Sequence, residues 1–323
     1  MGFIINKVVR DMNLKNLLDI EFPIIQGGMA NIATGEFAAA VSNSGGLGII
    51  ATGGLNTEQL KEEIRKCKSL TDKPFGVNLM LLNPCIDEIA IMIIEEGVKI
   101  ITTGAGNPGK YISKWKEENM IIIPVVPSVA LARRMEKLGA TAIIAEGTES
   151  GGHVGELTTM TLLPQVINAV NIPVIAAGGI ASGSQFAAAI SLGACGVQVG
   201  TCLLVSTECP IHENYKEAIL KAKDTGTIVT GRNVGVPVRA LKNYMTREYV
   251  KIEKTTNDKM ELEKYTLGSL RKAVFDGDIK MGSMMAGQVS GQLTEIKPIR
   301  DILTEIYYGG YEVIKNIGAY YEN

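Results

Sequence analysis

Two glycine-ended apolar runs, VIAAGGI at residues 174–180 and VQVGT at residues 197–201, decide the fold of this chain. Each run reads as a short strand that is nearly continuous in hydrophobicity and stops at glycine. Strands of this kind are typical of parallel sheets that helices cover on both faces. The second run begins soon after the helix-like stretch that follows the first, which predicts a βα unit.

Working outward from these runs, the same unit recurs along the first two thirds of the chain. Strands are predicted at residues 23–26, 48–51, 75–79, 99–102, 121–126, 142–145, 174–177 and 197–199. Eight alternating βα units predict a TIM-type (β/α)8 barrel of the α/β class.

Helix signals lie between the strands. Ser128 is predicted to cap a helix over residues 128–138, and another helix over 182–192 ends before Gly193. Thr57 is predicted as the N-cap of a third helix. An open doubly wound sheet is the alternative, but its GxGxxG turn is not convincing, because the GGLG at residues 45–48 precedes a strand instead of opening a helix.

The pattern changes after residue 202 and indicates three parts. Residues 1–12 form an N-terminal addition, to which no role is assigned, residues 13–222 the barrel domain, and residues 223–323 a mainly helical C-terminal extension. Helices are expected over residues 214–223, 261–275 and 299–319. We expect the extension to pack on the barrel and to close over its active site.

Composition excludes several classes of function. The formal net charge of −2 provides no field to attract nucleic acid or anionic lipid, and no run of 18 apolar residues indicates a membrane span. The N-terminal sequence does not resemble a signal peptide. Five cysteines without CxxC spacing are typical of reduced thiols. We therefore expect a cytoplasmic protein without a bound structural metal.

The last two strands end in a pattern typical of a phosphate site. Barrels often bind phosphate with the loops after strands seven and eight, where backbone N–H groups face the anion. Here those loops carry Gly178, Gly179, Gly200 and Thr201, and glycine lets the backbone approach closely. Tight turns without a ligand are the alternative.

Two further segments carry candidate chemistry. His153 lies in the glycine-rich loop ESGGHVG at residues 149–155 and is one of only two histidines, so it is the first candidate for proton transfer near neutral pH. A surface histidine without a role is the alternative, and His212 reads as an ordinary helix-entry residue. The segment MGSMMAGQ at residues 281–288 suits either a flat ligand or a methionine-rich helix contact.

Several of these motifs together resemble a known family. QGGM at residues 26–29, PFGVN at 74–78, ESGGHVG at 149–155, AAGGI at 176–180 and QVGT at 198–201 are similar to the nitronate monooxygenase superfamily of FMN barrels. Longer stretches resemble its FMN-dependent enoyl-acyl-carrier-protein reductase II branch. They are TTGAGNP at 102–108, PVVPSVALA at 124–132, LTTMTL at 157–162, VRALKN at 238–243 and MAGQ at 285–288.

The resemblance implies roles for individual residues. His153 matches the proposed catalytic histidine, and Glu146 stands where monooxygenase relatives have glutamine, which favours the reductase branch. The residues implied to bind FMN are Gly28, Met29, Asn78, Glu146, Gly151, Gly152, Gly178, Gly179, Gly200, Thr201, Met285, Gly287 and Gln288.

The resemblance also implies a reaction. A hydride passes from NADH or NADPH, by way of FMN, to the β-carbon of a trans-2-enoyl thioester carried by acyl-carrier protein, in bacterial fatty-acid elongation. A homodimer is expected, and the family sometimes requires a monovalent cation. Three alternatives stay open: a nitronate monooxygenase, a phosphate-binding isomerase barrel, and a binding module without catalysis.

Overall fold

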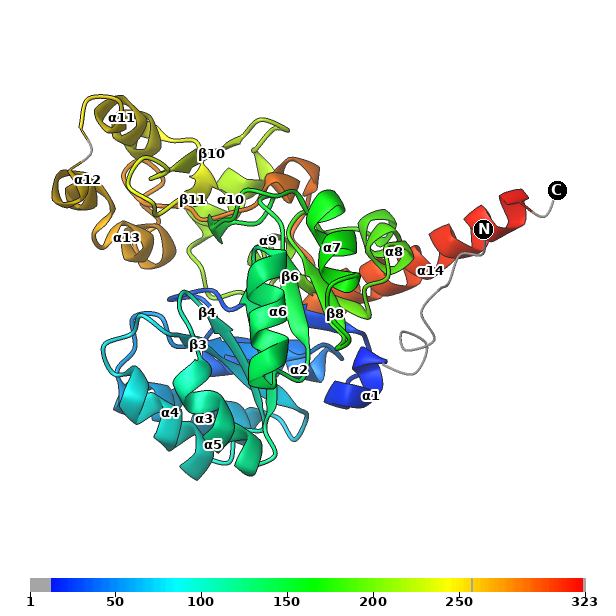
Figure 1. Ribbon diagram of the computed structural model, residues 1–323. Helices are drawn as coiled ribbons and strands as arrows, with labels where there is room; N and C mark the ends of the chain where they lie inside the picture. Colours follow the sequence, from blue (N-terminus) through cyan, green and yellow to red (C-terminus); the bar gives the residue numbers. More distant parts are fainter. Residues whose placement is uncertain (1–12, 257, 322–323) are drawn as a thin grey trace.

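The computed structural model describes residues 13–256 and 258–321, and its centre is a barrel of eight parallel strands (Figure 1). The strands follow one another in the order β1–β9–β8–β6–β5–β4–β3–β2. Their bounds are β1 Ile24–Gln26, β2 Gly48–Ala51, β3 Phe75–Met80, β4 Ile100–Gly104, β5 Ile121–Val126, β6 Ile143–Glu146, β8 Val174–Ala177 and β9 Gly196–Val199. All eight predicted strands are confirmed, some with ends displaced by one or two residues.

The barrel closes between β1 and β2 through Leu47. Ile25 and Leu47 form a parallel bridge, the Leu47 N–H donates to the Ile24 carbonyl at 2.9 Å, and the Gln26 N–H donates to the Leu47 carbonyl at 2.9 Å. Helix α1 (Leu14–Leu18) packs its leucines into the cluster of isoleucines that fills the barrel interior. The fold prediction of a TIM-type barrel is therefore confirmed.

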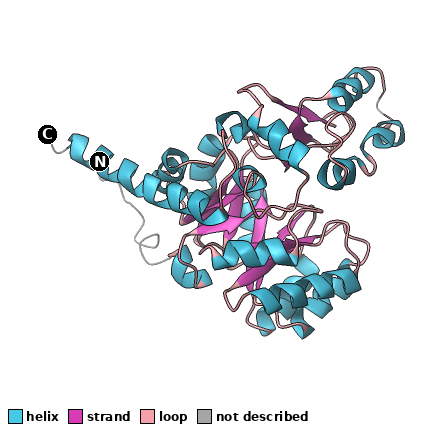
Figure 2. Cartoon of the chain, turned by 180° about the vertical axis from the view of Figure 1, so that it is seen from behind, coloured by secondary structure: helices cyan, strands magenta, loops and turns pink. Residues whose placement is uncertain are grey.

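Helices surround the barrel, as Figure 2 shows from behind. They are α2 Gly35–Asn43, α3 Thr57–Leu70, α4 Ile86–Glu95, α5 Gly109–Glu117, α6 Val129–Leu138, α7 Thr159–Ile167 and α8 Gly183–Ser191. The predicted cap at Ser128 and the predicted end of α8 before Gly193 are confirmed. The structure adds that Ser182 caps α8 and that Gly139 and Gly193, after the two helices, have positive φ.

The predicted cap of α3 is wrong. Asn56, not Thr57, is the N-cap, because its side chain accepts the Gln59 N–H while the Gln59 side chain accepts the Asn56 N–H. This reciprocal pair is a capping box, and Thr57 lies in the first turn, where its hydroxyl donates to Glu88.

The C-terminal extension combines helices with a small sheet. Helix α10 Glu213–Leu220 leads into it, and its elements are β10 Thr227–Thr230, β11 Val238–Leu241, α11 Tyr244–Glu253, α12 Lys259–Thr266, α13 Ser269–Phe275, the 3-10 helix η1 Gln288–Gln292 and α14 Ile299–Tyr321. The single helix predicted over 261–275 is wrong, because Leu267 and Gly268 separate two helices and Gly268 has φ of +71°. The α10 and α14 predictions hold to within a few residues.

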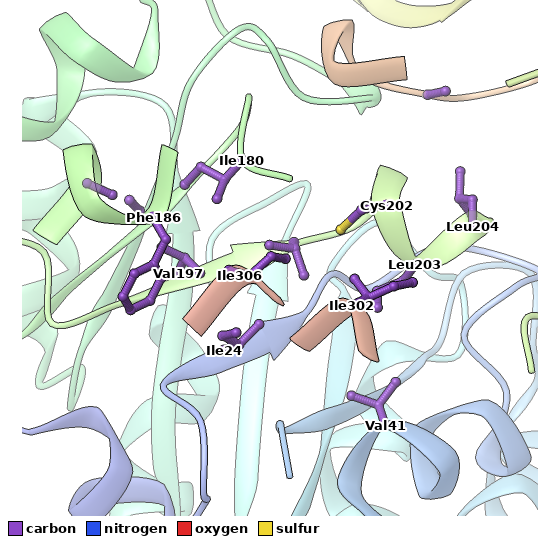
Figure 3. Close-up of a cluster of buried hydrophobic side chains, with 14 of the residues drawn as sticks. Ile24, Val41, Ile180, Phe186, Val197, Cys202, Leu203, Leu204, Ile302 and Ile306 are labelled. Carbon is purple, nitrogen blue, oxygen red and sulfur yellow. The ribbon is translucent and has the colours of Figure 1, made fainter. Parts of the chain in front are cut away.

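Helix α14 returns from the extension to the barrel. Figure 3 shows its Ile302 and Ile306 among Ile24, Val197 and Phe186. Gly183 of α8 lies so close to the α14 backbone that a Cβ there would come within 2.5 Å of the Gly310 nitrogen. Along residues 13–256 and 258–321 we find no helix with the length and apolar character needed to cross a membrane. The predicted addition at residues 1–12 lies outside the described residues.

Candidate active site

The two glycine turns of the predicted phosphate site lie side by side. Strand β8 pairs with β9, and each ends at one of the turns. Gly178 and Gly179 have φ of +91° and +74°, a region that side chains other than glycine rarely adopt. Gly200 precedes the short helix α9 (Thr201–Leu204). The backbones of both turns are therefore at the same edge of the barrel.

The two turns differ in the space beside them. A Cβ on Gly200 would contact only the Met29 sulfur, at 3.7 Å, whereas one on Gly178 would come within 2.7 Å of the Gly147 carbonyl. The Thr201 hydroxyl accepts the Gly287 N–H at 2.9 Å, which leaves its own hydrogen free for another acceptor. Backbone N–H groups and this hydroxyl can thus bind a phosphate together.

The carboxylate of Glu149 lies beside the turns, and the start of helix α7 compensates its charge. The ideal Cβ position of Gly179 is 3.2 Å from the Glu149 Cβ. Both Glu149 oxygens accept the Thr159 N–H, at 3.0 Å each, where α7 begins. The start of a helix stabilises a carboxylate, so Glu149 is held in the loop and directed at α7. Thr159 also donates its hydroxyl to the Gly178 carbonyl at 2.8 Å.

Strands β1 and β3 form a second part of the site. Gly28 lies directly against Asn78, because a Cβ on Gly28 would come within 2.5 Å of the Asn78 Cβ. The Asn78 Nδ2 donates to the Thr102 hydroxyl at 2.8 Å. Gln26 is fully buried, yet its Nε2 has no hydrogen-bond partner within the described part of the chain. Buried amide groups are nearly always paired, so this one is available to a ligand.

Glu146 ends strand β6, in register with Ala177 at the end of β8. Burial raises the pKa of Glu146 from 4.5 to about 7. The nearby Ser150 hydroxyl opposes this increase in part, although the distance and angle between the two groups do not meet those of a hydrogen bond. A carboxyl with such a pKa is partly protonated at neutral pH and can donate as well as accept a hydrogen bond.

His153 lies on a strand that the sequence did not predict. Gly152–His153 form β7, which pairs antiparallel with β11, so that His153 is opposite Val238. The side chain keeps an exposed surface, and partial burial of the imidazole lowers the pKa of His153. The neutral ring, which dominates at neutral pH, can donate through one nitrogen and accept through the other.

The predicted methionine segment lies on the His153 loop. Gly151 meets it so closely that a Cβ would come within 2.7 Å of the Ala286 carbonyl carbon, and the Gln288 N–H donates to the Glu149 carbonyl at 2.9 Å. The Met285 sulfur is 3.7 Å from the ideal Cβ position of Gly152. Segment 285–288 therefore joins the loop to the turn at Thr201.

Two residues that support this arrangement were missed by the sequence analysis. Tyr215 is fully buried and donates its hydroxyl to the Met285 carbonyl at 2.8 Å. Arg239 is buried and donates from Nε to the Thr148 carbonyl at 3.1 Å. Neither has a local motif that would reveal a partner so distant in the sequence. Arg239 does lie in the VRALKN stretch that carries the family resemblance.

Two open hollows lie elsewhere on the described surface. One, of about 390 Å³, is bounded by loops after β2 and β3, and the other, of about 370 Å³, by α10 and the end of β11. Neither hollow is lined by the glycine turns, so the candidate site is defined by the polar and glycine residues at the strand ends.

Among residues 13–256 and 258–321, no group of three or more His, Cys, Asp or Glu side chains could hold a metal ion. All five cysteines are free thiols.

Comparison with known proteins gives the family. The model of the nitronate monooxygenase family matches residues 11–309. The chain belongs to this family. FabK from Thermotoga maritima is 47% identical, with a TM-score of 0.93, over 95% of this chain and 98% of that one.

Curated relatives in the family have different names. A probable nitronate monooxygenase of Staphylococcus aureus (strain JH9) is 36% identical over 91% of this chain and 95% of its own length. A Mycobacterium tuberculosis protein named (3aS,4S,5R,7aS)-5-hydroxy-7a-methyl-1-oxo-octahydro-1H-indene-4-carboxyl-CoA dehydrogenase is 37% identical over 73% of this chain and 67% of its own. The family and these relatives indicate a flavin oxidoreductase.

Proposed function

We propose that the chain is an FMN-dependent enoyl-acyl-carrier-protein reductase that reduces trans-2-enoyl thioesters with NADH or NADPH. The observation that carries the proposal is the likeness to FabK, which covers nearly all of both chains. Glu146 adds support, because the resemblance associates glutamate at this strand end with the reductase branch and glutamine with the monooxygenases.

The residues at the strand ends fit FMN. Gly178, Gly179, Gly200 and Thr201 would hold its phosphate through backbone N–H groups and a hydroxyl. The rest of the predicted set would meet its ring system from strand ends β1, β3 and β6, from the loop and from segment 285–288: Gly28, Met29, Asn78, Glu146, Gly151, Gly152, Met285, Gly287 and Gln288. The unpaired Gln26 Nε2 is a further donor there.

When bound, FMN supplies the hydride chemistry that side chains cannot provide. The protein would orient the enoyl thioester and exclude water, and His153 would act where charge develops. Hydride addition at the β-carbon places negative charge on the thioester oxygen, and a neutral imidazole can donate a hydrogen bond to it. We assign His153 to that oxygen or to the proton transfer at the α-carbon.

The remaining features of the proposal follow the family resemblance. NADH or NADPH acts as a transient co-substrate, and acyl-carrier protein presents the substrate to a homodimer in the cytoplasm. A monovalent cation, which the family sometimes requires, belongs to the same proposal. Residues 13–222 would bind FMN, and residues 223–323 would close over the site through segment 285–288.

Replacement of His153 tests its role. His153→Ala should retain FMN, measured by its absorbance, and lose turnover with a crotonyl thioester by about 10²- to 10⁴-fold. His212→Asn is the matched control, since His212 is the N-cap of α10 and asparagine also caps helices. Unchanged turnover in His153→Ala would remove His153 from the mechanism.

Nitronate monooxygenase activity is the second candidate, because the curated Staphylococcus relative has that name. The substrate would then be an alkyl nitronate, the same histidine would act as a base, and oxygen would replace the enoyl thioester as electron acceptor. Oxygen consumption with an alkyl nitronate, faster than enoyl reduction with NADH, would favour this candidate.

A further inference from the structure

Arg239 is a buried cation: burial and the Arg232 charge lower its pKa, and the charge of Glu149, in the loop before His153, acts in the opposite direction without forming a salt bridge. Only 7% of Arg239 is exposed, and no salt bridge to it occurs among the described residues. Removing a charge from water is strongly unfavourable unless hydrogen bonds compensate. The groups that accept hydrogen bonds from the guanidinium therefore indicate its role.

The hydrogen bonds of Arg239 lead to the loop before His153. Its Nε donates to the Thr148 carbonyl at 3.1 Å, and its Nη1 donates to the Thr227 hydroxyl of β10 at 3.0 Å. Thr227 thus fixes the guanidinium from one side while the loop occupies the other. The planar fork of arginine suits two such acceptors at fixed directions.

The backbone of Arg239 holds the same loop a second time. Arg239 is opposite Gly152 in the β11–β7 pair, and Val238 is opposite His153. One residue therefore attaches the loop at Thr148 through its side chain and at Gly152 through its main chain. The loop between these two attachments has little freedom, and His153 follows it directly.

We propose that Arg239 is a positioning residue, which sets the geometry of the loop from Thr148 to Gly152 and thereby aims His153. Its importance for turnover rests on the proposed role of His153. Other contacts hold the extension as a whole, such as Tyr215 to Met285 and Gly287 to Thr201. Arg239 differs from them because its side chain bonds directly to the loop that leads to the histidine.

The chain offers a test that needs no substrate, because it has only two histidines. In tag-free protein with labelled histidine, Arg239→Met should shift or broaden the His153 imidazole signal and leave the His212 signal unchanged. Arg247→Met, at an exposed arginine of α11, is the matched control and should change neither signal. Thr227→Val removes only the hydroxyl that orients the guanidinium, so it should shift the His153 signal in the same way but by less than Arg239→Met does. This variant decides the test if Arg239→Met does not fold.

Turnover provides the second readout. Arg239→Met should retain FMN and lose about tenfold to a hundredfold in turnover, as small misplacements of reacting groups do. In a His153→Ala background the same change should cost nothing further, because the two residues act as one unit. An unchanged His153 signal in Arg239→Met and Thr227→Val, or a fully additive double variant, would overturn the proposal. Absence of enoyl reduction in the wild type would contradict the proposed function instead, and the spectra would still decide the role of Arg239.

Discussion

Gly287 lies where segment 285–288, the loop before His153 and the turn at Thr201 meet. A single methyl group added at Gly287 should push these three segments apart. The Gly287 φ of −78° suits any residue, so an alanine there introduces no backbone strain. A Cβ would, however, come within 2.6 Å of the Glu149 carbonyl, 3.1 Å of the Thr201 hydroxyl and 3.3 Å of the Gly151 nitrogen. Two of these atoms belong to backbone that cannot rotate away. Gly287→Ala should therefore displace segment 285–288 from the His153 loop and the Thr201 turn.

The size of the effect follows from the overlap. Overpacking of this kind costs about 1–3 kcal/mol. The bonds at risk are Gly287 N–H to Thr201 and Gln288 N–H to Glu149, both 2.9 Å long, and each contributes about 0.5–1.5 kcal/mol. If FMN binding requires the segment in place, 1–3 kcal/mol corresponds to about 5- to 150-fold weaker affinity.

The assay is FMN titration of the apoprotein, followed by flavin fluorescence, with the free energy of unfolding measured beside it. Gly104→Ala is the matched control, because Gly104 ends β4 at the same edge of the barrel and no atom lies within 4 Å of its ideal Cβ position. Wild-type affinity and stability in Gly287→Ala would refute the assembly of the site from these segments.

Three further predictions concern the cap, the buried carboxyl and the buried tyrosine. Asn56→Ala should lower the free energy of unfolding by about 0.5–2 kcal/mol, and Thr57→Ala should lower it by less, because Asn56 is the residue that caps α3. Denaturant unfolding measures both changes, and a larger loss in Thr57→Ala would contradict the capping box. Burial raises the pKa of Glu146 from 4.5 to about 7 in the folded protein, so the stability that this carboxyl contributes is present below pH 4.5 and is lost as the pH rises to about 7. The melting temperature of the wild-type apoprotein should therefore fall between these pH values, and that of Glu146→Gln should change less. Tyr215→Phe should cost about 1–3 kcal/mol by leaving the Met285 carbonyl unpaired, and a loss no larger than that of Tyr244→Phe at an exposed position would show that the bond is unimportant.

The barrel could be predicted because its signal is local. Each strand is a short apolar run ending at glycine or a polar residue, and burial on both faces makes the runs recognisable. The cap of α3 was misplaced by one residue because Asn56 and Thr57 are both residue types that cap helices, and only the reciprocal bond to Gln59 distinguishes them. The break at Gly268 was missed because helix-forming residues lie on both sides of it.

The site was harder to predict because its parts meet through distant pairings. Strand β7 consists of Gly152 and His153 alone, and it exists only because β11, more than 80 residues later, pairs with it. Two residues with a glycine have no strand signal of their own. Tyr215 and Arg239 likewise depend on partners that lie far away in the sequence. The glycine turns could be located from the sequence because each follows its strand directly.

Anaerobic mixing tests the central claim most directly. The FMN-loaded protein is mixed without oxygen with NADH, and in a parallel sample with NADPH, and its visible absorbance is followed before and after a 2-enoyl thioester is added. A reductase predicts that the flavin band is lost with at least one nucleotide and returns when the thioester is added. A band that neither nucleotide removes, or that returns only when oxygen is admitted, would contradict the proposed function.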